Sequence, residues 1–280
     1  MTAQQKTSLV ETKTRPRIPK SQQWYRPTFS REHGVYIVLL VSFLTGAAAA
    51  QQWTWTTTLA LICVFCAFQA EHPIAWQIRQ RKSWKPRLLV WASLYSGMAI
   101  AIALWLMWQS SHRFEFLIIY AFVIAALIVD VISVWHRQQK SRLNELITFA
   151  AVCLSAPLAY LATIGSISPI VIALWILNTL FFSSTIFTVK LRKTKTASII
   201  PATIYHGVAS VMILGIGLSG WLTLVTVSAF AIALGKFLFI LWQRDWYRKA
   251  KIQQVASLET FSSFAFLIIV ALSLLPPHLP

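Results

Sequence analysis

The sequence predicts an all-α protein, a polytopic bundle of about nine transmembrane helices. Hydrophobic residues make up 57% of the 280 residues, and the mean hydropathy is +0.63. The apolar residues gather in long runs, and a run of about 20 residues can cross roughly 30 Å of hydrocarbon. Helices satisfy their own backbone hydrogen bonds in lipid, so each run is predicted to be a helix. Little of the chain remains for a water-soluble domain.

Nine runs are long enough to be predicted as spans. In chain order they cover residues 35–50, 53–72, 88–108, 115–136, 145–164, 168–189, 198–218, 220–242 and 253–275. An odd number of crossings places the two termini on opposite faces of the membrane.

The cations support this division of the chain. Of the 25 Lys and Arg residues, 23 lie before the first run or after the second, fourth, sixth and eighth runs. The two exceptions are Arg113, in a connection on the other side, and Lys236, inside a run. Because short loops keep Lys and Arg in the cytoplasm, we expect the amino terminus to be cytoplasmic and the carboxyl terminus to be outside.

The net charge of +17 could indicate a nucleic-acid-binding protein. The cations sit in short clusters at helix ends, however, so we predict a bilayer with anionic head groups as their partner and no nucleic acid. Residues 1–25 are polar, basic and interrupted by prolines, which predicts a disordered cytoplasmic tail, and residues 26–280 form one transmembrane domain. The small residues 46–50 resemble a signal-peptide cleavage site, but the basic lead before them is too long for an ordinary signal peptide.

Four ionisable residues lie inside predicted spans at a similar depth. Asp130, Lys236 and Glu259 are each about 9 Å from the inner end of their span, and His206 is about 12 Å from it. A charge inside a span normally faces a partner or a wet cavity. We expect Asp130 to pair with Lys236, although Lys236 could also snorkel to the head groups. With the amides of Gln69 and Asn178, these groups predict a cytoplasm-facing polar pocket.

Two Glu-His pairs stand at the same boundary, Glu32-His33 before the first span and Glu71-His72 at the end of the second. Together they could hold a metal ion, with Glu145 as a further carboxylate, although hydrogen-bonded helix ends are the commoner role of such histidines. The candidate catalytic residues are Glu32, His33, Asp130 and His206. The candidate ligand-binding residues are Glu71, His72, Glu145, Lys236 and Glu259.

The cysteines predict packing and no disulfide framework. Cys63 and Cys66 form a Cys-x-x-Cys pair inside the second predicted span, and Cys153 lies in the fifth. A redox role would need a thiolate, which hydrocarbon disfavours. Cysteine packs readily as a small hydrophobic residue.

The segment Ser30-Arg31-Glu32-His33-Gly34-Val35-Tyr36 resembles the entry signature of the YwiC-like family of bacterial membrane proteins. Asn144-Glu145 and the segment 187–192 fit that family less sharply. The resemblance implies an integral protein of a bacterial inner membrane or an internal, thylakoid-type membrane. It brings no established activity, cofactor or catalytic residue.

The predicted architecture also resembles that of UbiA-type intramembrane prenyltransferases. These enzymes hold a prenyl diphosphate through magnesium on two Asp-rich loops. Here the corresponding segments are 71–79, with Glu71 as its one acid, and 190–196, with none. One carboxylate is too few to hold magnesium on a diphosphate. The resemblance therefore extends to architecture alone, and the magnesium-dependent chemistry of those enzymes is not carried over to this chain.

Three functions remain open at the level of sequence. The first is binding or processing of an amphipathic molecule, such as an isoprenoid, quinone or pigment, with its head group in the polar pocket. The second is a non-enzymatic auxiliary or assembly factor for membrane complexes, and the third is a proton-coupled transporter. The pattern predicts no particular cofactor, reaction or protein partner.

Overall fold

The computed structural model describes residues 27–30, 33–81, 84–192 and 198–275. Every regular element in these residues is a helix, which confirms the all-α prediction. The helices are α1 (His33–Ala50), α2 (Trp55–Gln80), α3 (Pro86–Gln109), α4 (Arg113–Trp135), α5 (Arg142–Cys153), α6 (Ser155–Ile164), α7 (Pro169–Lys190), α8 (Ile200–Leu218), α9 (Leu224–Ser228), α10 (Ala231–Trp242), α11 (Arg244–Lys249) and α12 (Ile252–Leu274).

These helices account for all nine predicted runs. Eight helical segments of the described chain are long and apolar enough to cross a membrane, and α1 contributes a shorter apolar helix over Gly34–Ala50. Large apolar side chains such as Leu104, Phe122 and Val211 are exposed on the outside of the bundle. An apolar surface of this extent is expected where lipid is the solvent. The protein is therefore an integral membrane protein.

Two of the predicted spans are interrupted, contrary to the expectation of continuous helices. The run 145–164 divides into α5 and α6 at Leu154, where Pro157 cannot donate to the carbonyl of Cys153 because its ring has no N–H. The run 220–242 divides into α9 and α10 without a proline. Here the N–H of Phe230 donates to the carbonyl of Val227 at 3.1 Å, the tighter pattern of a 3₁₀ turn.

α2 is longer than the predicted second span. It begins after Thr54, whose side chain accepts the N–H of Thr57, and continues to Gln80 with Pro73 inside it. Glu71 and His72 therefore lie within a helix rather than at its end, which corrects the predicted boundary. The two extra turns carry α2 alongside the start of α3.

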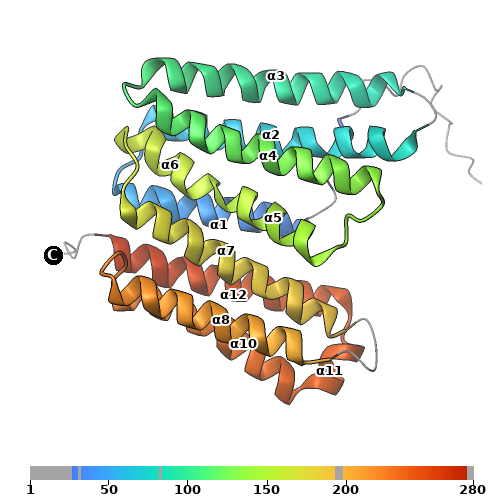
Figure 1. Cartoon of the computed structure of the whole chain (residues 1–280), viewed down its shortest axis with the longest axis vertical. Coiled ribbons are helices and arrows are strands. Elements are labelled where there is room, and N and C mark those ends of the chain that lie inside the picture. Colours follow the sequence, from blue (N-terminus) through green and yellow to red (C-terminus); the bar gives the residue numbers. More distant parts are fainter. Residues whose placement is uncertain (1–26, 31–32, 82–83, 193–197, 276–280) are drawn as a thin grey trace, which may run out of the picture.

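The segments rich in cations lie together at one end of the bundle, on the right in Figure 1. We call this end the basic end. It comprises the ends of α2, α4 and α7, the starts of α3, α5 and α8, and α11 with its flanks. α3 lies at one edge of the bundle, and α8 and α10 lie at the other, while α1 and α7 run through the middle (Figure 1). The buried core is centred on α7, where Leu174, Leu177 and Phe181 are almost completely buried.

Candidate functional site

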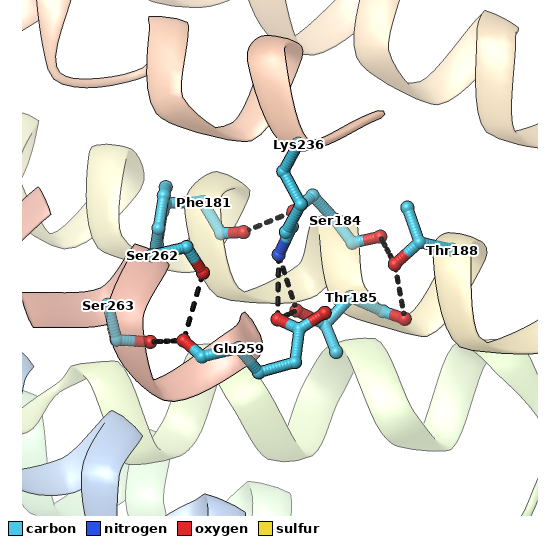
Figure 2. A network of polar contacts seen from close by, with 8 residues as sticks. All are labelled: Phe181, Ser184, Thr185, Thr188, Lys236, Glu259, Ser262 and Ser263. Atoms are coloured by element: carbon cyan, nitrogen blue, oxygen red, sulfur yellow. Dashed lines mark hydrogen bonds and ion pairs between the residues drawn. The ribbon is translucent and has the colours of Figure 1, made fainter. Parts of the chain in front are cut away.

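A buried ion pair joins α10 to α12. The Lys236 Nζ lies 2.7 Å from the Glu259 Oε2, and it also donates to the hydroxyl oxygen of Thr185 on α7 at 3.2 Å. Thr185 in turn donates to the same Glu259 oxygen at 2.7 Å. Figure 2 shows the three side chains converging between their helices. We call Lys236, Glu259 and Thr185 the charged centre.

The charged centre is closed to solvent on the lysine side. Only 2% of the Lys236 side chain is exposed, against 21% of the Glu259 side chain, and the ammonium lies 5.7 Å from the ring centre of Phe181. Ser262 and Ser263 donate to the backbone carbonyl of Glu259 (Figure 2). The Glu259 Oε1 is buried and has no hydrogen-bond partner among the described residues. One carboxylate oxygen is therefore used by the centre, and the other remains a spare acceptor.

His206 on α8 provides a second spare acceptor nearby. Its ring stacks on Phe237, the neighbour of Lys236, with 4.1 Å between ring centres. The Nδ1 lies 2.8 Å from the carbonyl oxygen of Ala202, so we assign the proton to Nδ1. The Nε2 of the neutral ring is then an acceptor, and it is buried without a partner in the described structure. His206 and the charged centre thus lie on adjoining helices, since α8 packs against α7.

Tyr247 on α11 is a buried residue of the basic end that sequence reasoning missed. Burial raises the pKa of its phenol, and the negative charge of Glu259 raises it further, so the side chain stays protonated. The Nε of Arg192 donates to the Tyr247 carbonyl at 3.1 Å, and its guanidinium lies 5.8 Å from the Tyr247 ring centre. In the sequence, Tyr247 is only an aromatic residue in a short polar connection. Such a residue indicates a position at the membrane interface and says nothing of a contact with Glu259.

The predicted pair of Asp130 with Lys236 is wrong. Asp130 on α4 accepts a hydrogen bond from the Asn144 side chain on α5 at 3.0 Å, while Lys236 pairs with Glu259. The physical reason is adjacency: α4 packs against α5, and α10 packs against α12 and α7. Lys236 also does not snorkel, because its side chain is buried at the pair.

The single predicted pocket therefore divides into separate polar groups. Glu145 on α5 pairs with Lys190 at the end of α7, with 2.5 Å between Nζ and Oε2. Gln69 donates to the Tyr36 hydroxyl at 2.6 Å and accepts from the Ser30 N–H, which ties the entry motif to α2. Asn178 donates to Thr45 in the core between α7 and α1. Neither amide reaches the charged centre.

The remaining candidates lie on α1, α2 and the segment before them. His72 has its ring 5.7 Å from that of Trp76, and Glu71 precedes it on α2. Glu32 and the side chain of His33 lie outside the described residues. Among the residues that are described, no three His, Cys, Asp or Glu side chains are grouped as a metal site. The predicted set of two Glu-His pairs thus stays a prediction.

The cysteines pack in the bundle. Cys63, Cys66 and Cys153 are buried and free. The Cys63 thiol donates to the carbonyl of Ala99 at 3.3 Å, and Cys153 accepts from Ser42. These contacts agree with their predicted use as small apolar residues.

The opposite end also holds a polar contact that sequence reasoning missed. The Glu115 carboxylate at the start of α4 accepts the N–H of Ile167 and lies 3.3 Å from the Nδ1 of His112. It ties the α3–α4 connection to the α6–α7 connection. One carboxylate therefore contacts both connections at this end.

Comparison with known proteins identifies one family. Residues 29–160 match the model of a family described as YwiC-like protein, and this stretch contains the entry motif, α1 to α5 and the first part of α6. No curated protein and no solved structure matches the chain. The charged centre lies beyond the matched stretch, whereas Asp130, Asn144 and Gln69 lie within it. The predicted resemblance is confirmed over residues 29–160, which are similar to the YwiC-like family.

Proposed function

We propose that the protein binds an amphipathic molecule whose polar head group enters the bundle at the charged centre. One observation carries the proposal: an ion pair lies inside an apolar bundle with two unused acceptors beside it, the Glu259 Oε1 and the His206 Nε2. Ionisable groups are costly at such a depth and usually mark a site where a ligand or ion binds. A buried polar atom without a partner needs an explanation, and a bound donor is the one proposed for these two acceptors.

The chemistry of the spare atoms selects the kind of head group. Both atoms accept hydrogen bonds, so the complementary group is a donor such as a hydroxyl. A second negative charge beside Glu259 would be repelled in an environment of low dielectric constant. Among the amphipathic classes predicted from the sequence, an isoprenoid alcohol or a reduced quinone carries a hydroxyl. An isoprenoid diphosphate would not satisfy these atoms.

A double substitution tests this proposal without leaving a lone charge in the bundle. The variant Lys236→Met with Glu259→Leu removes the pair, and apolar replacement of a buried pair is usually tolerated by the fold. The wild type and the variant are purified into lipid nanodiscs, and the retained small molecules are identified by mass spectrometry. We expect a hydroxyl-bearing amphipathic molecule with the wild type and at least a tenfold loss with the variant.

The pair formed by Lys190 and Glu145 supplies the matched control. The variant Lys190→Met with Glu145→Leu removes equal charges from the same end of the bundle and should retain the molecule. Equal retention in both double variants, or a retained molecule without a hydroxyl or amine donor, would contradict the proposal.

A further inference from the structure

A hollow of about 220 Å³ lies between α2 and α3 at the basic end. It is lined by Pro73, Ile74, Gln77, Ile78, Trp84, Leu88, Leu89 and Ala92. All of these except Gln77 present mainly apolar atoms. Pockets that hold a whole small molecule usually enclose about 300–1,000 Å³, so this hollow has room for part of a chain. It lies on the helix pair at the edge of the bundle, away from the charged centre (Figure 1).

Lys85 is the cation next to this hollow. It directly follows Trp84, which lines the hollow, it precedes α3 by one residue, and it is exposed. Arg81 follows α2 with a positive φ of 50°, so it does not continue the helical face that lines the hollow.

The position of Lys85 is set by the fold. The Gln77 side-chain oxygen accepts the backbone N–H of Lys85 at 3.0 Å, which holds the start of α3 against the last turns of α2. Arg81 donates to the Trp135 carbonyl and lies 4.9 Å from that ring centre. Trp84 lines the hollow and is strongly exposed, as is typical of an indole at the head-group level.

A second copy of the chain is a poor occupant for this hollow. A copy with the same orientation in the membrane would bring its own basic end to the same level, where 23 of the 25 Lys and Arg residues are predicted to lie. Like charges at close range repel each other. An occupant with an apolar chain and a negative head group has the complementary charge.

We propose that this hollow binds an anionic phospholipid, with part of an acyl chain between α2 and α3 and the phosphate at Lys85. The acyl chain covers Ile74, Leu88 and Leu89. The phosphate accepts a hydrogen bond from the Lys85 ammonium at the point where α3 begins. This site is separate from the charged centre and does not depend on the proposed function.

A lipid titration followed by native mass spectrometry tests the assignment. Phosphatidylglycerol and phosphatidylcholine with identical acyl chains are added to the delipidated full-length protein in detergent. We expect the first to bind more tightly. Ala92→Leu should abolish this preferential binding because it fills the hollow, and Lys85→Gln should weaken it roughly fivefold, as expected for one interfacial cation.

Two control variants match these changes elsewhere. Gly215→Leu fills the larger hollow between α7 and α8 near Trp221, at the end opposite the basic end, and an added Cβ there meets open space. Lys249→Gln removes an exposed cation of the same basic end, on α11. Both should bind phosphatidylglycerol like the wild type. Equal binding of the two lipids, or unchanged binding by both Ala92→Leu and Lys85→Gln, would overturn the proposal.

Discussion

Lys236 and Glu259 each carry a charge that the apolar bundle cannot solvate. Their 2.7 Å contact and the hydroxyl of Thr185 replace the water that each charge would otherwise have. A buried pair of this kind adds little net stability over apolar residues of the same size, because desolvation offsets the attraction. A need for stability therefore does not by itself explain the presence of this pair inside a span.

Removing one partner alone should be far more harmful than removing both. We expect Lys236→Met to lower the free energy of unfolding by about 3–5 kcal/mol, because it leaves Glu259 charged and unpaired in the bundle. The double variant Lys236→Met with Glu259→Leu should recover most of this loss.

Thermal unfolding in a fixed detergent measures both effects. Lys190→Met serves as the comparison, because its pair with Glu145 is more exposed and its loss should cost clearly less. If Lys236→Met and the double variant were equally destabilised, the contact would not be a compensated ion pair.

At the scale of elements, α1 and α6 cross closely at Gly46. An added Cβ on Gly46 of α1 would meet the backbone of Ala156 on α6, at 2.7 Å from both its carbonyl carbon and its Cα. The crossing lies just after the interruption at Leu154, where α6 begins. Small residues allow helices to approach this closely in membranes, where van der Waals packing is a main source of helix association.

Gly46→Ala should therefore destabilise the protein even though alanine is the better helix former. We expect a loss of about 1–3 kcal/mol or more, since the backbone of α6 must move to make room. Gly97→Ala on α3 is the control, because nothing lies within 4 Å of its added Cβ. The control should be neutral or slightly stabilising. Similar unfolding temperatures for the two variants would show that α1 and α6 are not held at this distance.

At the scale of the whole molecule, most cations of the described residues lie at one end of the bundle, and large exposed apolar side chains cover its flanks. Helices α2, α4 and α7 end there, and α3, α5 and α8 begin there (Figure 1). The predicted orientation, with this end in the cytoplasm, rests on the retention of Lys and Arg by short cytoplasmic loops.

Labelling with a membrane-impermeant maleimide measures that orientation. In a background without the three native cysteines, Arg113→Cys reports on the opposite end and Lys249→Cys on the basic end, and both positions are exposed. In intact bacterial cells we expect labelling of Arg113→Cys, and labelling of Lys249→Cys only after the cells are permeabilised. The reverse pattern would invert the topology.

The sequence by itself determined the class, the spans and the location of the charged residues in them. Long apolar runs need a membrane, and an ionisable residue inside a run stands out whatever its partner is. The entry motif also predicted the resemblance to the YwiC-like family, because it is read locally along the chain. Lys236, Glu259 and His206 were found in this way.

Only the tertiary structure decided how these residues combine. Depth along a span is a local property, but pairing depends on which helices adjoin, and α10 adjoins α12 and α7 rather than α4. The same holds for Thr185, Tyr247 and the hollow between α2 and α3, since each acquires its role from a neighbour distant in the sequence. The break between α9 and α10 has no proline or glycine to mark it, so packing alone decides where that span is interrupted.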